Sequence, residues 1–96
     1  MYRIIEGRGT GKTSRLMLLA KENNAIFVCS NPSAMEYKAK KYGIEGITFI
    51  SYYDLIFHDG EYDGTRNFIV DELEELVNEA FFSNHAKMLG YSLTTE

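Results

Sequence analysis

Short apolar runs alternate along the chain with stretches in which apolar residues recur every three or four positions. Runs of strand length cover residues 2–5, 25–29, 47–50 and 67–70. Stretches with helical spacing cover residues 12–21, 32–42, 52–57 and 73–82. Strands that alternate with helices predict βαβ units, whose right-handed crossovers give a mostly parallel sheet with helices on both faces.

Capping and turn residues set the predicted boundaries of these elements. Asn31 can cap a helix that begins at Pro32, because the first helical position needs no amide hydrogen. Gly43 should end that helix, and Asn23-Asn24 should end the one before it. Ser51, with Asp54 three residues on, resembles the capping box of a short helix.

The last third of the chain completes the predicted sheet. Residues 58–66 hold two Asp-Gly pairs and are the most turn-like stretch, and Ser83-Asn84 should end the last helix. Residues 87–94 are expected to form a fifth strand. We therefore predict one domain over residues 1–96, with an α/β fold: a three-layer sandwich around a mostly parallel five-stranded sheet.

Two helices have apolar stripes that should face this sheet. In the first helix the predicted inward residues are Leu16, Leu19 and Ala20. In the last helix they are Leu73, Leu76, Val77 and Ala80, with acidic residues and Asn78 on the outer side. Phe81-Phe82 is expected to be core or, if both rings prove exposed, a protein contact.

Composition and charge narrow the class of protein. The formal net charge is −4, so the chain as a whole lacks the basic footprint that is usual for nucleic-acid binding. Cys29 is the single cysteine, which excludes an internal disulfide and indicates a reducing compartment. We see neither a secretory signal nor an apolar run long enough to cross a membrane, and we expect a cytoplasmic protein.

A glycine-rich loop separates the first predicted strand from the first helix. Its expected nucleotide-binding residues are Gly7, Arg8, Gly9, Thr10, Gly11, Lys12, Thr13 and Ser14. Glu6 stands where the phosphate-loop pattern has its first glycine, but Gly11-Lys12-Thr13 matches the second half. Lys12 should reach the β- and γ-phosphates, and Thr13 should place its hydroxyl on magnesium. The alternative is a glycine-rich turn without a ligand.

Two carboxylates follow the apolar strand that begins near Asn67. Asp71 is positioned to hold a magnesium-bound water near Thr13, and Glu72 to polarise the attacking water as a general base. The alternative is that both acids favour the first turn of the next helix through its dipole. The phosphate loop upstream makes a catalytic or metal role the better interpretation.

The two motifs together resemble the Walker A and Walker B motifs of the P-loop NTPase superfamily. The strand that ends in Asp71-Glu72 resembles the Walker B strand of the branch with an additional catalytic glutamate. The order of segments is similar to that of the first RecA-like domain of helicases and phage packaging ATPases. The resemblance implies a phage-type protein linked to DNA processing, with a polar sensor at Ser92 or Thr94. The resemblance also implies that an arginine from a partner protein or a second copy of the chain stimulates hydrolysis.

These features predict a minimal ATPase that uses Mg²⁺ and ATP, with Lys12 and Glu72 as catalytic residues and Thr13 and Asp71 as metal ligands. One alternative is a nucleotide-binding regulatory module with little hydrolysis, and a third is a small kinase, although no lid segment is visible. A basic and aromatic patch on one predicted helix is either a nucleic-acid contact or a solvated face. It comprises Tyr37, Lys38, Lys40, Lys41 and Tyr42.

Overall fold

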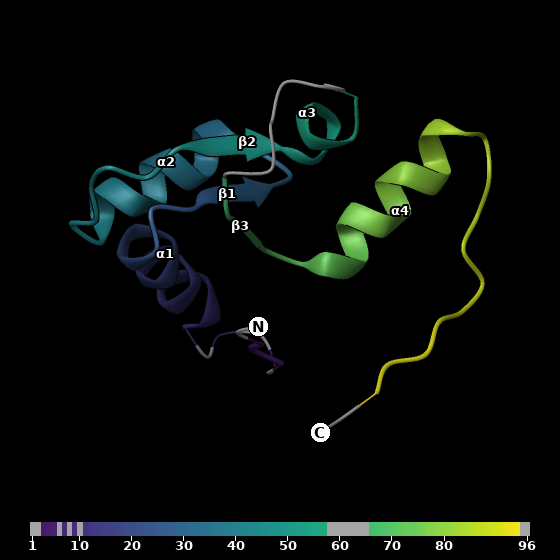
Figure 1. The fold of residues 1–96 in the computed structure, drawn as a ribbon, viewed down its shortest axis with the longest axis horizontal. Helices are drawn as coiled ribbons and strands as arrows, with labels where there is room; N and C mark the ends of the chain where they lie inside the picture. Colours follow the sequence, from purple (N-terminus) through teal and green to yellow (C-terminus); the bar gives the residue numbers. More distant parts are fainter. Residues whose placement is uncertain (1–2, 6, 8, 10, 58–65, 95–96) are drawn as a thin grey trace.

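A computed structural model describes residues 3–5, 7, 9, 11–57 and 66–94 of the chain. In this part of the chain, four helices surround a small sheet (Figure 1). The helices are α1 (Lys12–Glu22), α2 (Pro32–Lys41), α3 (Tyr52–Phe57) and α4 (Leu73–Ser83). The strands are β1 (Ile26–Cys29), β2 (Phe49–Ser51) and β3 (Phe68–Val70). No helix of the described residues is long and apolar enough to cross a membrane.

The sheet has β1 at its centre, in the order β2-β1-β3, and both pairings are parallel. Phe27 lies opposite Phe49 of β2 and Ile69 of β3. Every residue of β1 is buried, as expected for a parallel strand covered on both faces. The predicted α/β class and the parallel sheet are therefore confirmed.

The main core lies on the face of the sheet that Phe27 and Cys29 share. Met17 and Ala20 of α1 and Ala39 of α2 pack against this face, and all five residues are at most 3% exposed. The rings of Phe27 and Phe49 meet edge to face at 5.3 Å within this core. The two helices are thus fixed side by side on one face, and both begin near the carboxyl ends of the strands.

The sheet has three strands in the described part of the chain, so the prediction of five strands is wrong. Residues 3–5 form no strand, and Ile5 is 76% exposed. Residues 87–94 also form no strand, and Leu89 and Leu93 are largely exposed. Both segments have β-prone residues, but neither buries its apolar side chains against a neighbouring strand, and β-propensity depends on that packing.

Two predicted helix faces also need correction. Met17, which the predicted stripe omitted, is fully buried, whereas Leu16 and Leu19 are half-buried. Leu73 was predicted to face inward but is 57% exposed. It opens α4, a helix that packs mainly against α3 rather than on the sheet, and no residue of α4 is fully buried. Phe81 and Phe82 are both exposed.

The capping predictions are confirmed for the middle of the chain. The Asn31 side chain accepts a hydrogen bond from the Ala34 amide at 3.2 Å, with Pro32 at the first position of α2. The Ser51 hydroxyl accepts from the Asp54 amide at 3.0 Å at the start of α3. The third predicted strand begins two residues later than expected, at Phe49. The Asp-Gly pairs within residues 58–65 lie outside the described residues.

Candidate functional site

The glycine loop leads directly into the N-terminus of α1. Gly9 and Gly11 have φ angles of 76° and 77°, a left-handed conformation that glycine adopts without strain. Gly11 is the residue before the helix, and neither a side-chain cap nor an acidic residue occupies the first turn. The positive end of the α1 dipole is therefore not neutralised by a first-turn carboxylate. Three predicted loop residues, Glu6, Arg8 and Thr10, lie outside the described residues.

Two hydroxyl residues follow Lys12 on the first turn of α1. The Ser14 hydroxyl donates a hydrogen bond to the Gly11 carbonyl at 2.9 Å, which ties the helix start to the left-handed turn. Thr13 is half-buried. The structure thus gives Ser14 a role in shaping the loop, which the sequence motif alone did not predict.

Asp71 lies at the carboxyl end of β3 and is only 5% exposed. Its amide donates to the Val28 carbonyl at 2.9 Å, which extends the parallel ladder by one residue. The hydroxyl of Tyr52, at the start of α3, donates to the Asp71 carbonyl. Tyr52 therefore fixes the backbone at the candidate site, and no sequence motif indicated this. Its burial follows only from the packing of α3.

Burial changes the acid–base properties of this corner. Desolvation raises the pKa of the Asp71 carboxyl, and the neighbouring charge of Glu72 raises it further. The positive charges of Lys12 and Lys38 act in the opposite direction on the same pKa. Desolvation, together with nearby carboxylates, also raises the pKa of the Tyr52 phenol. A cation placed beside Asp71 would favour the ionised carboxylate.

An ion pair joins the two predicted motifs. Lys12 Nζ lies 3.1 Å from Glu72 Oε1, and the two side chains are 21% and 45% exposed. Glu72 has a φ of 57°, which is unusual for a residue with a side chain, and it directly precedes α4. Residues 60 positions apart in the sequence are thus brought into contact at the carboxyl edge of the sheet.

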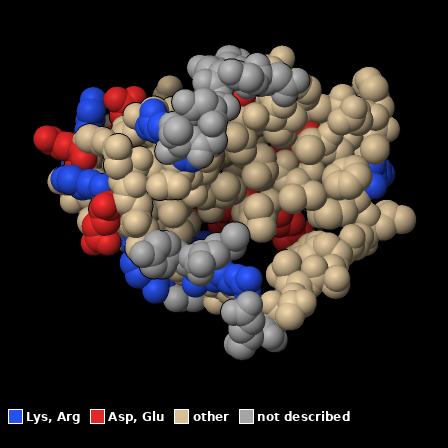
Figure 2. Space-filling view, in the orientation of Figure 1, with Lys and Arg blue, Asp and Glu red and all other residues tan. Residues whose placement is uncertain are grey.

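This contact lies in an open hollow of about 480 Å³, which is within the size range of small-molecule sites. Its walls come from the glycine loop, α1, α2 and the start of α4. Its lining residues are Gly9, Gly11, Lys12, Thr13, Ser14, Lys38, Tyr42, Glu72 and Glu75. Figure 2 shows acidic side chains in the hollowed centre of one face of the molecule, with basic side chains near its lower edge.

The two predicted metal ligands offer oxygen donors, the kind that Mg²⁺ prefers. Thr13 lies on the wall of the hollow, and Asp71 precedes the wall residue Glu72. Among the described residues, no group of three or more His, Cys, Asp or Glu side chains could hold a metal ion. A magnesium ion held by Thr13 and Asp71 would therefore need phosphate oxygens and water to complete its coordination.

The predicted sensor residues are not brought to the sheet. Ser92 and Thr94 are exposed, in a segment without regular structure that runs from the end of α4 (Figure 1). The Thr94 carbonyl accepts a long hydrogen bond, 3.4 Å, from the Arg3 guanidinium. In this structure, neither residue lines the hollow.

Cys29 ends β1 close to the candidate site but is a packed side chain. It is 1% exposed, and its thiol donates a weak hydrogen bond to the Ile50 carbonyl at 3.6 Å. Burial, helped by the charge of Asp71, raises the thiol pKa to about 11. The prediction of a packed thiol rather than a nucleophile is consistent with this environment.

The hollow thus brings together a helix N-terminus, two lysines and two carboxylates, and its helix N-terminus and lysines could bind an anion. Comparisons of the chain with protein-family models, curated proteins and solved structures gave no match.

Proposed function

We propose that this protein binds ATP with magnesium in the hollow between the glycine loop and α4, and that it hydrolyses the γ-phosphate slowly. The observation that carries the proposal is the contact between Lys12, at the start of α1, and Glu72, at the end of β3. The glycine loop and the acidic pair, which are far apart in the sequence, meet in one hollow. ATP hydrolysis there would need both a bound phosphate chain and an attacking water.

The glycine loop supports binding of phosphate. Left-handed backbone at Gly9 and Gly11 allows successive amides to converge on an anion, and the α1 dipole adds positive potential at the same place. Lys12 adds a full positive charge. A magnesium ion held by Thr13 and Asp71 would neutralise charge on the phosphates.

Hydrolysis requires that Glu72 leave Lys12. In the described structure the carboxylate is paired with the lysine that should bind phosphate. When phosphate takes the place of this partner, Glu72 is released beside the γ-phosphate and can orient a water molecule. Residues 3–5 and 87–94 do not extend the sheet, so a RecA-like core with a sensor strand is not a basis for this proposal.

The Lys12–Glu72 pair also favours a second candidate, a nucleotide-binding regulatory module. If the pair re-forms each time nucleotide leaves, the protein has two arrangements that ligand can switch, and turnover is not required. Contact with a DNA-processing partner, or a partner arginine that speeds hydrolysis, would act on the nucleotide-bound arrangement.

The test is a titration of a fluorescent ATP analogue with Mg²⁺ into the full chain, followed by an assay of phosphate release. Lys12→Ala should weaken binding about 10- to 100-fold, because a hydrogen bond to a charged group contributes about 1.5–3 kcal/mol. Lys21→Ala is the matched control, since it removes one lysine from the last turn of the same helix, outside the hollow.

Saturable binding that Lys12→Ala weakens and Lys21→Ala leaves intact would support the site. Release of phosphate then favours the ATPase, and binding without release favours the regulatory module. A folded wild type that binds no nucleotide, or a Lys12→Ala variant that binds as tightly as wild type, would contradict the proposal.

A further inference from the structure

Helix α2 supplies a wall of the hollow that no sequence motif assigned to the nucleotide site. Lys38 in the last turn of α2 and Tyr42, the residue that follows the helix, line the same hollow as Lys12 and Thr13. The basic and aromatic patch predicted on this helix is therefore divided by the fold, because only two of its five members lie at the hollow.

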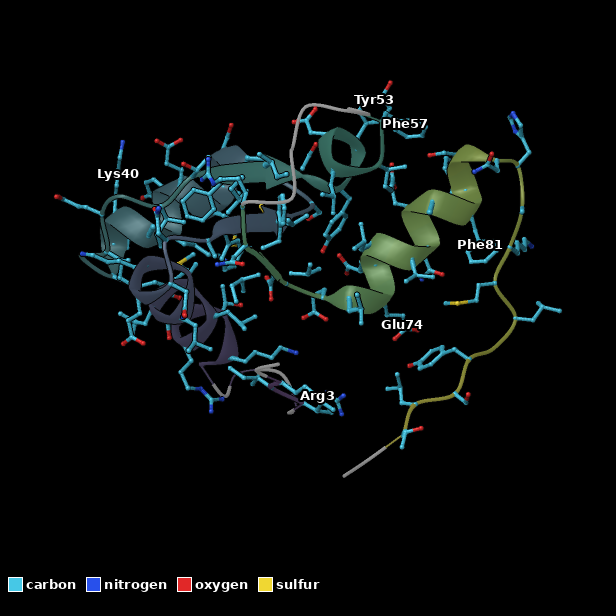
Figure 3. All side chains as sticks on the ribbon, in the orientation of Figure 1. Arg3, Lys40, Tyr53, Phe57, Glu74 and Phe81 are labelled. Atoms are coloured by element: carbon cyan, nitrogen blue, oxygen red, sulfur yellow. The ribbon has the colours of Figure 1, made fainter. Side chains whose placement is uncertain are left out.

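The other members of the patch have different surroundings. Lys41 Nζ lies 5.1 Å from the centre of the Tyr37 ring, in cation–π contact outside the hollow. Lys40 points away from the body of the molecule (Figure 3). Three lysines of similar sequence context thus differ in what they face, and Lys38 is the one directed to the candidate site.

Packing of α2 explains this direction. Ala39 is buried against the sheet, and Met35 packs on the same core, so the helix is held by that face. Lys38 precedes Ala39 and lies beside this buried stripe, on the side of the glycine loop. Lys38 lines the hollow together with Glu72, which follows the end of β3.

The hollow requires more positive charge than Lys12 provides. Glu72 and Glu75 line it, and the buried residue Asp71 directly precedes Glu72 in the chain. A triphosphate keeps net negative charge after magnesium binds, so each of these carboxylates opposes its entry. Another cation on the wall would offset this repulsion.

We propose that Lys38 is a second phosphate-binding cation of this pocket and that it contacts the γ-phosphate from the α2 wall. The proposal rests on the proposed nucleotide site and deepens it. In some phosphoryl-transfer enzymes, an arginine of a partner protein supplies positive charge at the γ-phosphate. Lys38 would supply part of that charge from within this chain. Because the contact is with the γ-phosphate, Lys38 should distinguish ATP from ADP.

The experiment compares Lys38→Ala with Lys40→Ala in the full chain, with binding of fluorescent ATP and ADP analogues measured in the presence of Mg²⁺. Both changes remove one exposed lysine from α2, so their effects on helix stability and net charge are matched. Lys38→Ala should weaken ATP binding about tenfold or more and ADP binding far less, and Lys38→Arg should restore most of the difference. Lys40→Ala should leave both affinities unchanged.

Several outcomes would overturn the assignment. Equal ATP affinity in Lys38→Ala and Lys40→Ala would show that Lys38 does not contact the ligand, and equal loss for ATP and ADP would exclude the γ-phosphate contact. In either case Lys12→Ala tests the proposed site separately. If Lys12→Ala loses nucleotide binding, the proposed site is still supported even though the role of Lys38 is rejected. A wild type that binds neither analogue would reject the site and this role of Lys38 together.

Discussion

The side chain of Glu72 has two incompatible roles at the candidate site. It neutralises Lys12 at 3.1 Å in the described structure, and the proposed reaction needs it beside a water molecule. An ion pair at this level of exposure contributes little to stability, so its replacement by phosphate is not energetically demanding. Under the proposed function, Glu72 would therefore both oppose the entry of phosphate and orient the water that attacks the bound phosphate.

Glu72→Gln separates the two roles. Loss of the negative charge should free Lys12 and strengthen nucleotide binding severalfold, whereas phosphate release should fall at least about 100-fold if Glu72 is the general base. The measurement is the dissociation constant and the single-turnover rate of the same preparation.

Glu74→Gln is the control for this prediction, because Glu74 is an exposed acid in the first turn of α4 and does not line the hollow. Unchanged phosphate release in Glu72→Gln would leave the regulatory module as the better function. Weaker binding in Glu72→Gln would contradict the competition between Glu72 and phosphate for Lys12.

Asp71 predicts a pH dependence whose sign follows from its burial. Its pKa is raised in the folded protein, so the folded state keeps a proton that the unfolded chain loses near pH 4. This residue's contribution to stability therefore falls as the pH rises from about 4 through the raised pKa, and it stays low above that value.

Asp71→Asn should consequently be more stable than wild type at pH 7, and its stability should decline less as the pH rises over this window. Urea unfolding at several pH values measures both effects, with Glu22→Gln as a surface control. The same variant should lose the magnesium dependence of ATP binding. A neutral-pH stability below that of wild type would show that the Asp71 carboxylate is stabilised by groups other than those identified.

The sequence could predict single residues only where a motif sets their chemistry. Asn31 caps α2 and Gly11 directly precedes α1, as the local patterns predict, whereas the phosphate contact of Lys12 stays a prediction. Tyr52 belongs to no motif, and Lys38 was predicted only as one member of a basic and aromatic patch. Their positions at the site depend on how α3 and α2 pack on the sheet, which is information from distant parts of the chain.

At the level of elements, α2 connects the fold to the proposed site. Its N-terminus is capped by Asn31, its last turn carries Lys38, and Tyr42 directly follows it at the hollow. Asn31→Ala should lower the free energy of unfolding by about 1 kcal/mol, the usual value for loss of a side-chain cap. Urea denaturation followed by circular dichroism measures it.

Asn31→Asp provides the control for this capping prediction, since aspartate accepts the same hydrogen bond from Ala34 and should retain most of the stability. Equal stability of Asn31→Ala and wild type would mean that the cap contributes nothing and that α2 is held by its packing through Ala39 alone.

Elements that pack against a neighbour in the described structure were predicted within two residues of their bounds, whereas the two predicted strands near the ends of the chain were wrong. Helix α2 and β1 have clear ends and buried residues, and they occur within one residue of the expected bounds. Residues 3–5 and 87–94 have β-prone side chains but no strand beside them in the described structure. Strand formation needs a partner, and a local pattern does not reveal one.

At the scale of the whole molecule, the site depends on convergence of three separate stretches of chain. The parallel sheet places the ends of its strands at one edge, and α1 and α2 pack on one face so that both reach that edge. The chain has a net charge of −4, and acidic residues line the hollow. Under the proposed function, Lys12, Lys38, the α1 dipole and a divalent cation would together offset the repulsion between these carboxylates and a bound polyanion.

This convergence predicts that ligand stabilises the fold as a unit. If ATP with Mg²⁺ binds the folded chain alone, a concentration 100 times the dissociation constant should add about 2.7 kcal/mol of stability. For a domain of this size, that corresponds to a rise in Tm of about 10 °C or more. A thermal scan with and without nucleotide measures it, and magnesium alone or ATP with EDTA should give much smaller shifts. At the same nucleotide concentration, Lys12→Ala should reduce the shift to about half or less, and Lys21→Ala should keep it. A shift of equal size in Lys12→Ala would show that the ligand binds elsewhere on the molecule and that it does not stabilise the fold through the glycine loop.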